Sequence, residues 1–111
     1  MSTQGLVTVK SGDKVLIKVV AGCDGMNARK LANRLKKAWP VSIQEAYKMA
    51  LETKFGDEAC LVVITDSEAI FEGEPYEDKE LGFLYRETFQ QPRFNPRWKL
   101  GTADHIVVID V

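Results

Sequence analysis

The sequence contains only two cysteines and one histidine in 111 residues. Cys23 and Cys60 are too few for the disulfide framework of a small secreted domain, so we expect a reducing, cytoplasmic environment. Structural zinc sites take four nitrogen, sulfur or oxygen ligands, and so small a set of soft ligands does not favour one inside a single chain. The sequence therefore predicts no metal site, and nothing in it indicates a cofactor.

Long apolar runs are also missing. The longest clear run, residues 59–64, is far shorter than the roughly 20 residues that a membrane-spanning helix needs. The first residues, MSTQGLVTVKSGDK, are polar and lack the continuous apolar segment of a signal peptide. We therefore expect no membrane partner.

The chain has little net charge, −1, and so no overall attraction to nucleic acid or anionic lipid. The charges are unevenly distributed, however. Residues 1–55 contain ten Lys and Arg against four acids, whereas residues 56–111 contain five against twelve. This division predicts a polar interaction surface and a homodimer, in which the acidic segment 72–80 of one copy faces the basic first helix of another. Alternatively, the two halves fold together and their charges cancel within one domain.

The chain has no internal repeat, linker or low-complexity tract, and its 45 % hydrophobic content is sufficient for a core, so residues 1–111 are expected to form one domain. We predict an α+β fold, a mixed β-sheet of about four to five strands with about two to three helices packed mainly on one face. Residues 68–73 and 78–90 fit both strand and helix spacing and are left open. The predicted strands are 6–10, 14–20, 59–65 and 105–111, and the first predicted helix is 28–37.

Two helices are predicted between the second and third of these strands. The first begins after Asp24, which is placed to cap it, and ends before Pro40, because the residue preceding a proline avoids helical geometry. The second begins at Ser42, which with Glu45 has the spacing of a capping box, and Gly56 is placed to stop it. The apolar residues that should face the sheet are Ala28, Leu31, Ala32 and Leu35 in the first helix and Ile43, Ala46, Tyr47, Ala50, Leu51 and Phe55 in the second.

The stretch VVAGCDGMNARK carries the most specific chemical signal. Cys23 and Arg29 are separated by five residues, between a predicted strand and a predicted helix. This spacing resembles the phosphate-binding loop of cysteine-dependent phosphatases and arsenate reductases. The resemblance implies that Cys23 is a nucleophile and that Arg29, Gly25 and backbone N–H groups hold an anion. The alternatives are simple anion binding by Cys23, Gly25 and Arg29, or a plain strand-to-helix turn.

The first helix offers a second candidate surface. Its polar face holds Lys30, Arg34 and Lys37, which are suited to phosphate groups of nucleic acid. The alternative, which we favour, is an ordinary solvated face of an amphipathic helix.

The stretch QQPRFNPRWK offers a third candidate. Pro92 and Pro96 stiffen the backbone. Phe94 and Trp98, interleaved with Arg93 and Arg97, could stack on a ligand or a base. The alternative is that Phe94 and Trp98 fold back onto the core while the two arginines stay in solvent. We favour packing, and keep Arg93, Phe94, Arg97 and Trp98 as candidate ligand-binding residues.

In its overall character the chain resembles the α+β proteins encoded by mobile integron gene cassettes. That resemblance implies a bacterial, soluble, often oligomeric accessory protein and no assigned reaction. The function we predict is a non-enzymatic binding or interaction module for a small-molecule or protein ligand. The alternatives are a phosphatase-like or anion-binding protein that uses Cys23 to Arg29, and a nucleic-acid binder that uses the basic helix.

Overall fold

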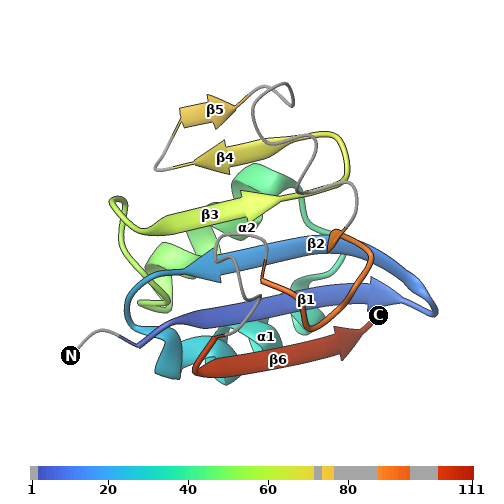
Figure 1. Ribbon diagram of the computed structural model, residues 1–111, viewed down its shortest axis with the longest axis horizontal. Helices are drawn as coiled ribbons and strands as arrows, with labels where there is room; N and C mark the ends of the chain where they lie inside the picture. The colour runs from blue at the N-terminus through green and yellow to red at the C-terminus, as the bar shows by residue number, and fades with distance from the viewer. Residues whose placement is uncertain (1–2, 72–73, 77–87, 96–102) are drawn as a thin grey trace.

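In the residues that the structure describes, six strands form one mixed sheet, and two α-helices cover one of its faces (Figure 1). The computed structural model describes residues 3–71, 74–76, 88–95 and 103–111. The predicted α+β class is thus confirmed. The elements are β1 (Gly5–Ser11), β2 (Lys14–Ala21), the short 3-10 helix η1 (Gly25–Asn27), α1 (Ala28–Ala38), α2 (Ile43–Glu52), β3 (Leu61–Ile64), β4 (Ala69–Phe71), β5 (Glu74–Tyr76) and β6 (His105–Asp110).

The strand order is β5-β4-β3-β2-β1-β6. Neighbouring strands are antiparallel except β1 and β6, which run parallel. The sheet has more strands than predicted, because residues 69–71 form β4 and residues 74–76 form β5. Residues 68–73 fitted both strand and helix spacing in the sequence, and β5 follows directly after them. All four residues of β3 are buried, as expected for a continuous apolar strand covered on both faces.

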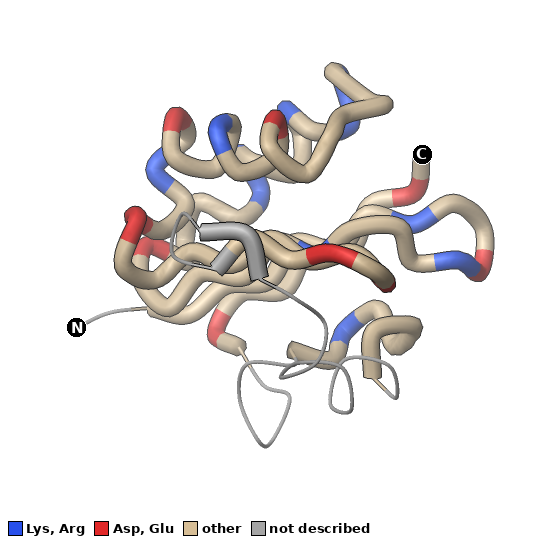
Figure 2. The backbone as a smooth tube through the Cα atoms, turned by 90° about the horizontal axis from the view of Figure 1, so that it is seen from above, with Lys and Arg blue, Asp and Glu red and all other residues tan. Residues whose placement is uncertain are grey.

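The larger core lies between the sheet and the helices. Figure 2 shows both helices on one side of the sheet, with segment 88–95 on the other. Alternate residues of the strands point to the helices, because the side-chain period of a strand is two. The predicted stripe of α1 is fully buried there, and most of the α2 stripe is buried with it. The strand residues on this face are Val7, Val9, Ile17, Val19, Ala21, Leu61, Val63, Ile70, Val107 and Ile109.

The opposite face of the sheet carries a second, smaller core. Its centre is closed by Phe89, which comes from segment 88–95 and is only 2 % exposed. The helices α1 and α2 thus lie on one face, as predicted, and segment 88–95 covers part of the other face. The strand residues in this second core are Leu6, Val15, Val20, Val62, Ile64 and Ala69.

The helix ends correct two details of the sequence analysis. The capping box is confirmed, since Ser42 and Glu45 bond each other's backbone N–H groups. However, α2 ends at Glu52, and Lys54, with a φ of 58°, is the first residue after it that turns left-handed, two positions before Gly56, whose φ is 80°. Asp24 precedes η1 with a φ of 56° and makes no side-chain cap bond. None of the helices in the described residues is long and apolar enough to cross a membrane.

Candidate functional site

The loop that holds Cys23 begins where β2 ends. In the structure Cys23 is joined to Cys60 by a disulfide, with the two Cα atoms 6.4 Å apart. This pairing was not predicted from the sequence. Its physical reason is the antiparallel pairing of β2 with β3, in which Ala21 lies opposite Leu61. The ladder continues one step further, since Gly22 N–H donates to the carbonyl of Cys60 at 3.0 Å, and this sets the two sulfurs side by side.

The same loop uses its backbone donors within the fold. Gly25 N–H donates to the carbonyl of Thr3 at 3.0 Å, and Asn27 N–H donates to the carbonyl of Asp24 at 3.2 Å. Gly25 lacks a side chain for a packing reason, because a Cβ there would overlap the backbone of Gln4. Arg29 is exposed. Catalysis or anion binding by Cys23, Gly25 and Arg29 stays a prediction, and the nucleophile it needs would be available only after the disulfide is reduced.

A carboxylate lies beside the two cysteines. Asp57 N–H donates to the sulfur of Cys60 at 3.3 Å, and the Cys60 N–H donates back to the carbonyl of Asp57 at 3.1 Å. Among the described residues, one carboxylate oxygen of Asp57 and the sulfurs of Cys23 and Cys60 all lie within 4.8 Å of one another. We name these residues the Cys23–Asp57–Cys60 cluster. The sequence analysis missed it, although the spacing Asp57-x-x-Cys60 is visible in the sequence.

Tyr47 lies on α2, and its pKa is affected by burial and by two acids of the loop between α2 and β3. Its hydroxyl is buried and makes no hydrogen bond with a described residue. Burial raises the pKa of Tyr47, and the negative charges of Glu58 and Asp57 raise it further. The neutral phenol is therefore favoured at physiological pH.

The basic face of α1 points to solvent. Lys30 and Lys37 are exposed, and Arg34 is half-buried and lies 3.4 Å from a carboxylate oxygen of Glu52 on α2. Such surface pairs add little to stability. The cations of α1 thus lie on an exposed helix face, and nucleic-acid binding by Lys30, Arg34 and Lys37 stays a prediction.

The stretch QQPRFNPRWK is described only up to Asn95, so Arg97 and Trp98 lie outside the described residues. Arg93 is exposed and Phe94 is half-buried. The backbone here is tied to the sheet, because the hydroxyl of Thr8 donates to the carbonyl of Pro92 at 2.5 Å. The described half of the stretch thus lies against the sheet with Arg93 at its surface, and the packing of Phe94 and Trp98 into the core stays a prediction.

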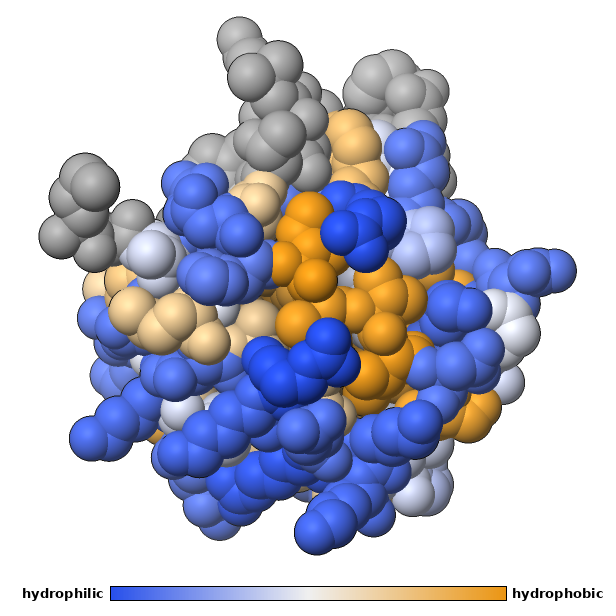
Figure 3. Space-filling view, turned by 90° about the horizontal axis from the view of Figure 1, so that it is seen from below, coloured by the Kyte–Doolittle hydropathy of each residue, from blue (hydrophilic) through white to orange (hydrophobic). Residues whose placement is uncertain are grey.

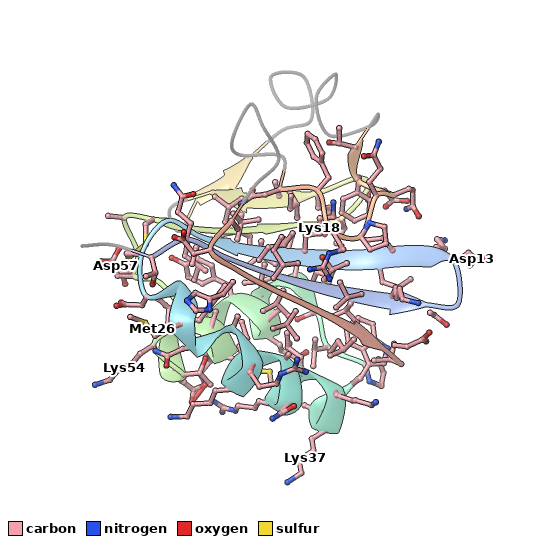
Figure 4. All side chains as sticks on the ribbon, turned by 60° about the horizontal axis from the view of Figure 1, so that its bottom comes forward. Asp13, Lys18, Met26, Lys37, Lys54 and Asp57 are labelled. Carbon is pink, nitrogen blue, oxygen red and sulfur yellow. A yellow bond between two sulfur atoms is a disulfide. The ribbon has the colours of Figure 1, made fainter. Side chains whose placement is uncertain are left out.

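The strongest tie between this segment and the sheet is Lys18, which is completely buried. Figure 4 shows Lys18 on the side of the sheet away from the helices. Its ammonium group donates to the carbonyls of Thr88, Gln91 and Phe94 at 3.1, 2.8 and 2.7 Å. These bonds use all three ammonium protons. Burial lowers the pKa of Lys18 from 10.5 to about 8.

A lysine with a lowered pKa is a candidate catalytic amine. Lys18 does not fit that role, because it is completely buried and its ammonium group donates to three backbone carbonyls of described residues. Its ammonium also lies 5.6 Å from the ring centre of Phe89, where the face of the ring attracts a cation. The group therefore acts as an anchor for segment 88–95.

The free edge of β6 is the remaining candidate surface. His105 N–H donates to the carbonyl of Gln4, and Val111 N–H donates to the carbonyl of Lys10, so the odd-numbered residues of β6 bond β1. Backbone groups point alternately to the two sides of a strand. The N–H and C=O groups of Ile106, Val108 and Asp110 must therefore point away from β1, toward the outer edge of the sheet. Figure 3, which views the molecule from the side of β6, shows hydrophobic residues gathered in one area.

Among the described residues, two places thus combine chemical capacity with access to solvent, the Cys23–Asp57–Cys60 cluster and the outer edge of β6. Lys18 anchors segment 88–95, and ligand binding by Arg93, Phe94, Arg97 and Trp98 stays a prediction. No family model, no curated protein and no solved structure matches this chain.

Proposed function

We propose that this chain is a non-enzymatic interaction module that forms a homodimer by pairing β6 with β6 of a second copy. The observation that carries the proposal is the outer side of β6, which pairs with no other strand of the described residues. Ile106, Val108 and Asp110 direct their N–H and C=O groups outward, as derived from the bonds to β1. An edge of this kind is a ready template for another strand.

The residue types of β6 support strand pairing. Edge strands that must stay single usually contain Lys, Pro or a bulge. The sequence of β6 is HIVVID, with four β-branched apolar residues in its centre and no Lys or Pro. Ile106 and Val108 are half-buried on the face away from the helices. Pairing would remove their remaining apolar surface from water.

The geometry of strand pairing suits a second copy of the same chain. Two identical edge strands meet antiparallel when a twofold axis runs perpendicular to the sheet, and the helices of both copies then lie on the same side. In the register centred on Val108, each Val108 faces Val108 of the second copy. Val107 then faces Ile109, so that β-branched residues from the two copies pair directly. The six-stranded sheet would continue across the axis.

The salt dependence of dimer formation distinguishes the β6 dimer from a dimer in which the acidic segment 72–80 binds the basic helix α1. Helix α1 packs on β1 and β6, so the two basic helices would flank the twofold axis and repel each other. Added salt screens such repulsion. A dimer joined at β6 should therefore hold or tighten as salt rises, whereas the pairing of segment 72–80 with α1 should weaken. Most of segment 72–80 lies outside the described residues.

The test is sedimentation velocity over a concentration series, at low and moderate salt. We expect a monomer–dimer equilibrium in the parent chain, and a loss of dimer in Val108→Lys, because each copy would bring an ammonium to the axis. Gln44→Lys, which adds the same charge on the exposed side of α2, should leave the dimer intact. A parent chain that is monomeric at every concentration contradicts the proposal.

A cross-linking variant locates the contact. In Val108→Cys the two introduced cysteines would have Cα atoms about 5.5 Å apart in a hydrogen-bonded antiparallel pair, a separation that a disulfide can span. We expect a covalent dimer on mild oxidation, and none with Lys14→Cys at the exposed start of β2. Efficient cross-linking of Lys14→Cys and not of Val108→Cys would place the contact elsewhere and overturn the β6 interface.

A further inference from the structure

The Cys23–Asp57–Cys60 cluster carries an inference that is independent of the dimer. Its three residues come from two loops at the same end of the sheet, one after β2 and the other between α2 and β3. The pairing of β2 with β3 holds these loops together, and Gly22 N–H bonded to the Cys60 carbonyl fixes their spacing. The cluster is therefore positioned by the sheet as well as by the disulfide.

The carboxylate of Asp57 is oriented by the short turn that it begins. Ala59 N–H donates to one carboxylate oxygen of Asp57 at 2.9 Å, which leaves the other oxygen available to a cation. Asp57 N–H donates to the sulfur of Cys60 at 3.3 Å. Hydrogen bonds of this kind orient metal ligands and stabilise negative charge on them.

The position of Gly56 keeps this turn close to the sheet. Its φ is 80°, and a Cβ on Gly56 would lie 3.0 Å from the Cβ of Ala21 and 3.4 Å from the sulfur of Cys60. A side chain at this position would thus be strained and would press on Cys60. Glycine lets the Asp57 turn lie directly against the end of β2.

Access from solvent is open. Asp57 is exposed, and Cys23 and Cys60 are half-buried. Figure 4 shows Asp57 at the surface, at the end of the molecule where Met26 also lies. A small ion or a reductant can therefore reach the cluster without unfolding of the helix-side core.

We propose that the Cys23–Asp57–Cys60 cluster is a redox-gated site for a thiophilic divalent cation such as Zn²⁺ or Cd²⁺. A dithiol or phosphine reductant supplies two electrons, the S–S bond breaks, and each sulfur takes up one proton from water. Binding of the cation then displaces these two protons, and two thiolates and one carboxylate become its ligands. Two sulfur donors favour Zn²⁺ and Cd²⁺ over Mg²⁺ or Ca²⁺.

Three protein ligands leave one position of a tetrahedral ion open to water or to another ligand. The site would thus hold an exchangeable ion. An added low-molecular-weight disulfide re-oxidises the site: it accepts the two electrons and leaves as two thiolates, while the S–S bond between Cys23 and Cys60 forms again. Both sulfur ligands are then lost together, so metal release and disulfide formation are coupled.

The experiment is a cadmium titration of the phosphine-reduced chain without oxygen, followed by the thiolate-to-cadmium charge-transfer absorption. We expect one Cd²⁺ per reduced chain and no such band in the oxidised chain. Cys23→Ser and Cys60→Ser should each abolish tight binding. Asp57→Asn should weaken it by roughly tenfold or more, because a charged ligand is lost. Glu58→Gln, a neighbouring exposed carboxylate, should bind as the parent does.

Two outcomes would overturn the proposal. One is a reduced, folded chain that binds no Cd²⁺, and the other is binding that Cys60→Ser leaves unchanged. Circular dichroism in the near ultraviolet reports whether the reduced chain is folded. Should reduction loosen the fold, recovery of the folded signal on addition of Zn²⁺ supports the site, since a metal that binds only the native state stabilises it, and failure to recover contradicts it.

Discussion

At the scale of single residues, Lys18 shows how a charge is kept inside a small sheet protein. An ammonium removed from water is costly unless hydrogen-bonding partners replace the solvent. Three backbone carbonyls of segment 88–95 replace it here. Thr8, directly opposite Lys18 on β1, donates to the same segment. The two polar side chains thus bind one segment from neighbouring strands.

The lowered pKa of Lys18 predicts how stability depends on pH. The folded-state pKa is about 8, below the ordinary 10.5 expected in the unfolded chain. Between these values the unfolded chain binds more protons than the folded chain does, so the free energy of unfolding should rise with pH across this window. The cost of burying the charge is present in full below about pH 8.

Urea melts at several pH values, compared among variants, measure this contribution. Lys18→Met lacks the titrating group and should show a smaller rise than the parent above pH 8. Lys14→Met, an exposed lysine on the same strand, should follow the parent. The same pH slope in the parent and in Lys18→Met would refute a role for this group.

At the scale of elements, segment 88–95 covers part of the sheet face that lies away from α1 and α2. The side chain of Gln90 bonds both the N–H and the C=O of Val15, at 2.9 and 3.1 Å, and so acts as a short piece of strand pairing. Phe89 fills the space beneath it. In the described residues, the aromatic side chain that closes this core is therefore Phe89, while Phe94 is only half-buried.

Truncation of these two aromatic residues should separate their roles. Phe89→Ala should lower the free energy of unfolding by about 3–5 kcal/mol, as removal of a buried phenyl ring does. Phe94→Ala should cost clearly less, because part of its ring already contacts water. Denaturant melts of both variants provide the comparison. An equal cost for the two would contradict the assignment. The corresponding role of Trp98 as a core aromatic stays a prediction.

At the scale of the whole molecule, β6 has two functions that can be distinguished. Its inner side closes the core over α1, where Val107 and Ile109 are buried. Its outer side is the edge proposed to pair with a second copy. Because backbone groups alternate along the strand, a change at Val108 can affect the outer side while the bonds to β1 persist.

Removal of residues 106–111 tests the inner function. Loss of Val107 and Ile109 should cost roughly 3–6 kcal/mol from apolar burial alone, a large share of the roughly 5–15 kcal/mol that stabilises a domain. We expect a chain that is partly unfolded at room temperature, measured by denaturant melts. Deletion of Val111 alone, which is half-buried, serves as the control. A truncated chain as stable as the parent would contradict this role.

Much of the fold could be predicted from local patterns. The alternation of Val7 and Val9, the helical spacing in α1 and the Ser42–Glu45 box each act over a few residues, and the structure confirms them. Local strand and helix signals were equally balanced in residues 68–73. Residues 69–71 form strand β4 because they pair with β3. A strand depends on hydrogen bonds and side-chain contacts with a neighbouring strand, which its own sequence does not show.

The sequence by itself thus determined α1, α2 and the strands β1, β2, β3 and β6, and which of their faces are apolar, since both follow from side-chain period and capping. Only the tertiary structure decided which segments meet. The β2–β3 register brings Cys23 to Cys60, distant in sequence. The alternation of β2 places Lys18 on the face away from the helices, where the sequence pattern predicts contact with solvent. In the structure segment 88–95 covers Lys18 and buries it. The place of β6 at the sheet edge follows from strand order. These features rest on long-range contacts, which local periodicity does not encode.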